Sequence, residues 1–183
     1  MNYRHGYHAG NFADVLKHVA LCELLRLLTA KDKKLFVLDT HAGAGGYDLG
    51  GDLARRTGEA LGGIRRLAAP PRTGIPAAVA RYLAAVAAYD RKFGTAVEGP
   101  RRYPGSPRLV RAALRPGDRF VACELHPAEA LALKREFAGD RLRGATSAED
   151  DRLQTFRRHM GLGESPHRDS FGVDSAQAAV VLD

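Results

Sequence analysis

Two short apolar runs in the chain end in residues that could hold a nucleoside. The run 35–38 leads into Asp39 and a glycine-rich turn over residues 41–46, and the run 120–123 leads into Glu124. Small residues let the backbone approach a ligand, and a carboxylate can accept from both hydroxyls of a ribose. Each feature also has a plain structural interpretation, because glycine turns follow many buried strands and acids are favoured where helices begin. Together they indicate a nucleoside site where the two strands end.

The segment 39–45, which includes most of this glycine-rich turn, lacks the lysine of a phosphate-binding loop. The acidic end of the second run also argues against a site that cradles the phosphates of a nucleoside triphosphate. The glycine-rich turn and the acidic strand end together fit a cofactor that has a ribose and no phosphate. S-adenosyl-L-methionine is a cofactor of this kind.

A polar cluster lies before and on the first expected helix. Its members are His5, His8, Asn11, Asp14 and His18. A metal site is one interpretation, although the spacing of the histidines matches no recognised ligand pattern. A solvated N-terminal arm with one satisfied histidine is the plain alternative. In a functional interpretation, Tyr3, His5 and His8 lie over the cofactor cleft and His18 lies near the first strand-end turn.

The chain is strongly basic, with a formal net charge of +7 and an isoelectric point near 9.7. Such a field attracts polyanions, although it also serves solubility and carries no sequence preference. Two segments could contact phosphates: the loop 101–107, and a helical stripe of arginines. The stripe comprises Arg55, Arg56, Arg65, Arg66 and Arg72. An exposed loop and a solvated helix face are the alternative interpretations.

The elements that must position these residues alternate between helices and strands. Apolar spacing predicts a helix over residues 12–28 with Asn11 as its N-cap, and strands over 35–38 and 120–123. Further helices are expected over 75–93, over 109–114 with Ser106 as a cap, and over 128–137. Thr57-Gly58-Glu59 is a helix start signal. Residues 99–107 are too rich in proline and glycine for regular structure, and 178–183 resemble a third buried strand. This order predicts a doubly wound α/β sheet.

Three classes of protein receive no support from the composition. Cys22 and Cys123 lie far apart in apolar patterns, which indicates two reduced thiols rather than a disulfide framework. No apolar stretch approaches the length that spans a bilayer, and the N-terminus lacks the apolar region of a signal peptide. We therefore expect a cytoplasmic protein, with a monomer favoured, no membrane partner and no metal.

Four segments form an ordered series that matches a known family. They are residues 3–18, residues 38–45, Tyr103-Pro104-Gly105-Ser106-Pro107 and Glu124-Leu125-His126-Pro127. In order and spacing they resemble the bacterial 23S rRNA adenine-N6 methyltransferases of the RlmJ type, over about residues 1–140. The resemblance implies an α/β, Rossmann-like, S-adenosylmethionine-dependent methyltransferase sheet with a small inserted helical subdomain, here C-terminally incomplete. The implied parts are 1–52, the insertion 53–98, and 99–183 with an atypical tail from 144 to 183.

The resemblance also assigns roles to residues. It implies cofactor contacts at His18, His41, Ser106 and Glu124, and substrate contacts at Tyr3 and His5. The family recognises the adenine of the cofactor with an Asp-Gly pair. The nearest candidates here are Asp150 and Asp151, which no glycine follows.

The catalytic motif of the family is Asp-Pro-Pro followed by Tyr or Phe, at the end of the fourth strand. No Pro-Pro-Tyr or Pro-Pro-Phe occurs in these 183 residues, and Asp183 is the candidate for the motif acid. The leading hypothesis is S-adenosylmethionine-dependent methylation of adenine N6 in 23S rRNA, and because of the missing motif we expect this transfer to be weak or absent in the chain as given. The alternatives are a fragment that binds cofactor or RNA without turnover and, less favoured, a metal-dependent hydrolase.

Overall fold

The polar cluster lies on a short N-terminal turn and on the long helix that follows it. The structure, a computed structural model, describes residues 4–70, 73–94, 99–140 and 179–182. A short turn, η1 (His5–Tyr7), precedes helix α1 (Phe12–Thr29). The side chain of Asn11 accepts a hydrogen bond from the backbone N–H of Asp14 at 2.8 Å. This contact confirms Asn11 as the N-cap, because it satisfies a donor that the first turn of a helix leaves unpaired.

The main sheet brings together the two strands that were expected to carry the site. Strand β1 (Phe36–Asp39) pairs in parallel with β4 (Arg119–Cys123), with Asp39 opposite Ala122. Strand β5 (Ala179–Leu182) adds to the other edge of β4 in the antiparallel direction. Because β1 and β4 run in the same direction, Asp39 and Glu124 lie at the same end of the sheet. The expected α/β class is confirmed, with one antiparallel strand.

The direction of β5 bears on the expected place of the motif acid. Leu182 pairs with Phe120, near the start of β4, and Ala179 pairs with Cys123 at its end. The chain in β5 therefore runs away from the edge where Asp39 and Glu124 lie. Asp183 itself lies outside the described residues, and its role stays a prediction.

A second, two-stranded sheet contradicts the expected loop over residues 99–107. Strand β3 (Arg102–Pro104) pairs antiparallel with β2 (Gly46–Asp48). Pro104 is tolerated because it ends a short strand, where a missing backbone donor costs little. Helix α5 (Ser106–Ala113) begins directly after it, with Gly105 rather than Ser106 at the N-cap. The predicted cap was wrong because the Ser106 hydroxyl bonds a side chain on another strand, Asp39.

The inserted region is a set of short helices followed by one long helix. It comprises α2 (Asp52–Thr57), a π-helical turn η2 (Leu61–Arg65), α3 (Arg66–Ala68) and α4 (Ala77–Arg91). The predicted start signal over 57–59 also marks an end, since Gly58 closes α2 in the left-handed conformation. Gly63 lies where the backbone of η2 meets residues 10 and 11, and a Cβ there would overlap the carbonyl oxygen of Gly10. Glycine is therefore needed for this close approach.

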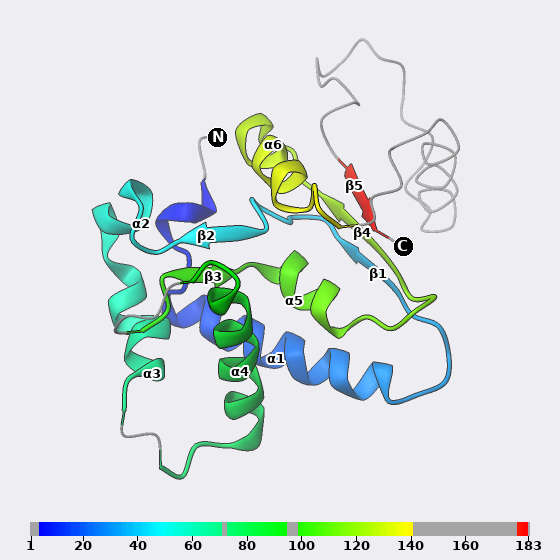
Figure 1. The fold of residues 1–183 in the computed structure, drawn as a ribbon, viewed down its shortest axis with the longest axis horizontal. Helices are drawn as coiled ribbons and strands as arrows, with labels where there is room; N and C mark the ends of the chain where they lie inside the picture. Colours follow the sequence, from blue (N-terminus) through cyan, green and yellow to red (C-terminus); the bar gives the residue numbers. More distant parts are fainter. Residues whose placement is uncertain (1–3, 71–72, 95–98, 141–178, 183) are drawn as a thin grey trace.

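Two apolar clusters hold these parts together. One lies at the sheet and includes Leu25 of α1, Phe120 of β4 and Phe137, which follows α6 (Pro127–Glu136). The other joins the insertion to the β2–β3 pair and includes Ile64, Tyr82 and Tyr103. Figure 1 shows α5 lying between β1 and α1, with the insertion gathered to the left of the sheet. The division at residues 53 and 98 stays a prediction, because the insertion shares its core with residues on both sides of it.

Candidate functional site

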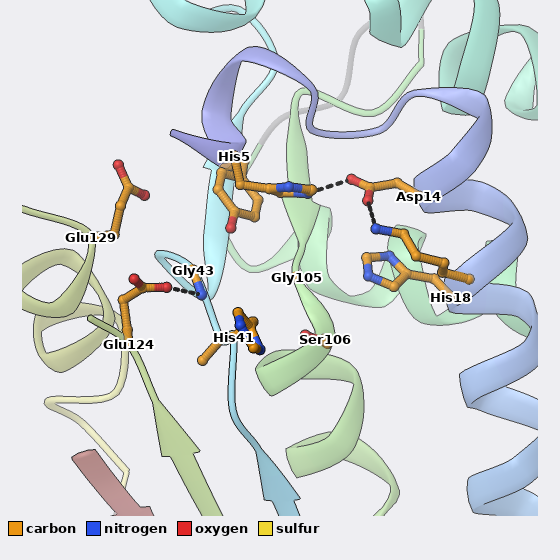
Figure 2. Close-up of a pocket in the computed structure, with 12 residues that line it drawn as sticks. His5, Asp14, His18, His41, Gly43, Gly105, Ser106, Glu124 and Glu129 are labelled. Atoms are coloured by element: carbon orange, nitrogen blue, oxygen red, sulfur yellow. Dashed lines mark hydrogen bonds and ion pairs between the residues drawn. The ribbon is translucent and has the colours of Figure 1, made fainter. Parts of the chain in front are cut away.

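The two strand ends form one wall of a cleft. The Glu124 carboxylate accepts hydrogen bonds from the backbone N–H of Gly43 at 2.8 Å and of His126 at 2.7 Å, one on each oxygen. Gly43 has a φ of +61°, and a Cβ there would overlap the Tyr47 hydroxyl. Glu124 therefore ties the glycine turn after β1 to the end of β4 (Figure 2).

The start of α5 closes this wall from the side. The Ser106 hydroxyl donates to the Asp39 carboxylate at 2.6 Å, and the backbone N–H of His41 donates to the other oxygen of Asp39 at 3.1 Å. The His41 side chain is exposed, and its Nδ1 lies 2.9 Å from the Thr40 hydroxyl. Asp39 therefore organises the turn and α5, while His41 stays at the cleft surface.

The opposite wall is built around a buried carboxylate on α1. Asp14 is 1% exposed and accepts from the backbone N–H of Gly10 at 3.0 Å, from His5 Nε2 at 2.8 Å and from Lys17 Nζ at 3.0 Å. Burial alone would raise the pKa of Asp14. The hydrogen bonds from His5 and Lys17 and the charge interactions with His5 and His18 outweigh burial and lower this pKa to about 2. Asp14 is therefore an anion that fixes His5 and Lys17 at the cleft.

His18 lies one helical turn further along the same wall. Its side chain is 6% exposed, and its Nδ1 lies 2.8 Å from the hydroxyl of Tyr103. The two rings stack with centroids 5.7 Å apart. Burial lowers the pKa of His18 to about 4, against the opposing charge of Asp14. His18 is therefore neutral at physiological pH.

The two walls enclose a cavity of about 270 Å³. Five residues that the sequence predicted for the site line this cavity. They are His5, His18, His41, Ser106 and Glu124. The structure thus brings together residues from four separate segments, and Figure 2 shows them around one space. The remaining predicted residues, Tyr3, Asp150, Asp151 and Asp183, lie outside the described residues, and their roles stay predictions.

A match to a family model covers most of the chain. The model "Ribosomal RNA large subunit methyltransferase D, RlmJ" matches residues 32–168. The chain belongs to the RlmJ family. This match confirms the resemblance that the four segments indicated.

Relatives and a solved structure agree with the family. The chain is 43% identical over 140 residues to ribosomal RNA large subunit methyltransferase J of Escherichia coli, covering 76% of this chain and 48% of that protein. It is 39% identical over 141 residues to the Haemophilus influenzae protein of the same name, covering 77% and 48%. The crystal structure of protein LPL1258 from Legionella pneumophila is similar with a TM-score of 0.58 and 40% identity, covering 69% of this chain and 43% of that one. The chain spans about half the length of the curated relatives it matches.

Three residues of this RlmJ-family site were not predicted from sequence. Lys17, Tyr47 and Glu129 line the cavity. Lys17 could have been found, because it follows Asp14 by three residues on the same helix face. Glu129, on α6, is 6% exposed and pairs with Arg4 at 3.0 Å, which joins the N-terminal arm to α6. No local sequence pattern signals this contact, since 125 residues separate its partners.

The N-terminal histidines of this family member bind carboxylates. His5 contacts Asp14, and His8 Nδ1 lies 3.0 Å from Glu59. Within the described ranges, no three His, Cys, Asp or Glu residues gather closely enough to hold a metal ion. The metal-dependent hydrolase therefore gains no support. No helix among the described residues is long and apolar enough to cross a bilayer.

The two basic segments differ in how far their charges are paired. Arg101 lies 3.4 Å from Asp48, and Arg102 lies 3.8 Å from the same carboxylate and 5.0 Å from the centre of the Phe93 ring. Arg55 and Arg66, on the insertion, have exposed side chains. Arg72 lies outside the described residues, so the full stripe stays a prediction.

Proposed function

We propose that this chain supplies the S-adenosyl-L-methionine-binding part of a methyltransferase that acts on N6 of an adenine in 23S rRNA. The observation that carries the proposal is the convergence of His5, His18, His41, Ser106 and Glu124 on one cavity. These residues come from segments as far apart in the chain as residues 5 and 124, and they meet at the carboxyl ends of two parallel strands. Ligands of open α/β sheets bind at this position. The RlmJ family and the names of the relatives support the reaction class.

The chemistry of the cavity fits this cofactor. Each oxygen of Glu124 accepts one backbone N–H, and a carboxylate oxygen has a second lone pair with which to accept from a ribose hydroxyl. At Gly43 and Gly105 the cradle has no side chains, and a Cβ at Gly105 would come within 3.1 Å of the Gly45 carbonyl oxygen. Glu124 and Glu129 give this side of the cavity an acidic lining that suits a cationic sulfonium.

The residues of this chain bind and orient rather than transfer. The cofactor, when bound, supplies an activated methyl group on sulfur. Asp14 holds His5 and Lys17 at the cleft, and Asp39 holds Ser106 against the glycine turn. Catalysis in such a site is positioning and electrostatics, and the Asp-Pro-Pro-aromatic turn that would face the reacting amine is absent from the sequence.

Ribosomal RNA is the proposed polyanionic partner. The net charge of +7 provides long-range attraction, and Arg55, Arg56 and Arg66 give the insertion exposed cations for phosphates. An enzyme that modifies ribosomal RNA would act in the cytoplasm.

Calorimetry with S-adenosyl-L-methionine tests the binding half of the proposal. We expect saturable binding that is unchanged by a chelator, and Glu124→Ala should weaken it by about tenfold or more, since the variant loses a charged acceptor and frees the Gly43 turn. Glu23→Ala is the matched control, because Glu23 pairs on the far side of α1 with Arg26 and Arg81. Its affinity should stay within about twofold. Equal affinities for the two variants would reject the ribose assignment, and no binding by the unchanged chain would reject the function.

A methyl-transfer assay tests the catalytic half of the proposal. With tritiated cofactor and unmodified 23S rRNA, we expect this chain to transfer little or no methyl group, because the motif that faces the amine is missing. Near-native transfer would show that the chain itself completes the catalytic site, and the binding-only alternative would then be wrong.

A further inference from the structure

Two buried tyrosines extend the polar network on the α1 side of the cavity. Tyr103, on β3, and Tyr82, on α4 of the insertion, are both 0% exposed. The Tyr103 hydroxyl lies 2.8 Å from His18 Nδ1 and 3.0 Å from the Tyr82 hydroxyl. The three groups form a chain that runs from the insertion to the cavity wall.

The ends of this chain differ in the partners they have. Within the described part of the protein, the Tyr82 hydroxyl has Tyr103 as its one hydrogen-bond partner, and His18 Nε2 has none. His18 lines the cavity, and Figure 2 shows its ring beside that space. One end of the chain is therefore sealed in the core, and the other end lies at the cavity.

The sealed end decides the direction of the hydrogen bonds. If Tyr82 donates to Tyr103 and Tyr103 donates to His18 Nδ1, both hydroxyl protons are used. In the opposite direction, His18 donates to Tyr103, Tyr103 donates to Tyr82, and the Tyr82 proton has no acceptor. A buried donor without a partner costs about 1–3 kcal/mol, so the first direction is favoured. The positions of the two hydroxyl hydrogens and of the His18 proton are inferred from the hydrogen-bond network in this way.

We propose that Tyr103 is a positioning residue that fixes His18 as the Nε2–H tautomer and presents that N–H to an acceptor atom of the bound ligand. This proposal rests on the proposed function only for the identity of the ligand, S-adenosyl-L-methionine.

The charge state of His18 makes the tautomer matter. Burial holds the ring neutral, and the titratable groups that influence its pKa are Asp14 and Lys17 of α1, His5 of η1 and Asp39 of β1. A neutral imidazole has one N–H, so the partner of Nδ1 decides whether Nε2 donates or accepts. With Tyr103 donating to Nδ1, the cavity receives a donor without a positive charge, which avoids repelling a sulfonium.

Nitrogen-15 NMR of the histidine-labelled chain, without ligand, tests the tautomer directly. The His18 signals are assigned by their loss in His18→Gln. We expect Nδ1 to resonate as a bare acceptor nitrogen and Nε2 as a protonated one. A protonated Nδ1 in the unchanged protein overturns the proposal, whatever the cofactor measurement gives.

Two hydroxyl deletions separate positioning from packing. Tyr103→Phe should move the Nδ1 signal toward that of a mixture of tautomers and weaken cofactor binding by about tenfold. Tyr82→Phe removes an equally buried hydroxyl one step away, and the Tyr103 proton still points to His18. The Nδ1 signal and the cofactor affinity of this variant should therefore stay near those of the unchanged chain, with the affinity within about twofold.

An unchanged Nδ1 signal in Tyr103→Phe, or equal losses of affinity in both variants, overturns the proposal. Absence of cofactor binding by the unchanged chain would instead reject the proposed function and leave the tautomer to the NMR result.

Discussion

The two walls of the cavity are built by different means. On the strand-end wall, Glu124 and Asp39 bond backbone groups in turns that directly follow their own strands or the neighbouring one. On the α1 wall, Asp14 and His18 bond side chains from the N-terminal arm, β3 and, through Tyr103, α4. The first wall is a property of the sheet, whereas the second exists only when distant segments pack together.

This difference decides how each wall tolerates substitution. A buried polar side chain is tolerated only when its partners are in place, so removal of one member of the α1 wall should lower the free energy of unfolding of the protein. The strand-end wall uses backbone donors that remain near their positions as long as β1 and β4 stay paired. We therefore expect substitutions in the α1 wall to affect folding, and substitutions in the strand-end wall to affect binding.

Removal of the Asp14 carboxylate should have the largest effect on stability. Asp14→Ala leaves the buried Gly10 N–H without its acceptor and removes the Asp14 contacts of His5 and Lys17, and we expect the free energy of unfolding to fall by about 3 kcal/mol. Urea denaturation measures this change. Asp32→Ala is the control, because Asp32 is exposed in the turn after α1 and should cost less than about 0.5 kcal/mol. A cost near that of the control would show that the α1 wall does not depend on its buried anion.

The pH dependence of stability should carry the next largest effect. The pKa of His18 is 6.5 in a free side chain and about 4 in the fold. Its folded pKa is lowered, so this contribution to stability is fully present above pH 6.5 and is lost as the pH falls toward 4. Between pH 7 and pH 5 the loss is about 2 kcal/mol.

Urea denaturation at both pH values, with the unchanged chain and His18→Gln, isolates this contribution. The unchanged chain should lose about 2 kcal/mol more than the variant between the two pH values. Equal losses would mean that His18 titrates as it does in the unfolded chain, and the α1 wall would then be wetter than its burial indicates.

A pair of neighbouring glycines tests the packing that supports the α1 wall. Gly63→Ala should destabilise the fold by about 2 kcal/mol, because the new Cβ would overlap the backbone of residues 10 and 11. Gly62→Ala places its Cβ in open space and should leave the stability unchanged or raise it by up to about 1 kcal/mol. Thermal or urea denaturation of both variants gives the comparison, and equal stabilities would contradict the close approach of η2 to the start of α1.

Much of the architecture could be predicted from local patterns. The N-cap at Asn11, the α1 helix, strands β1 and β4 and helix α6 lie within two residues of their expected bounds, since apolar periodicity and capping act over short distances. Strand β3 was missed because its proline-rich sequence forms a strand only against β2. The hydrogen bond of Ser106 was missed for a similar reason, because its acceptor, Asp39, lies 67 residues away.

The sequence by itself determined the strand ends, the glycine turn, the acid that follows β4 and the order of motifs that marks the RlmJ family. These features are local in the chain, so residue type and spacing specify them. The tertiary structure alone decided that Asp14 is a buried anion, that Glu129 reaches Arg4, and that Tyr82 and Tyr103 connect the insertion to His18. Burial and hydrogen-bond direction depend on which distant groups pack together, and no short-range pattern encodes that.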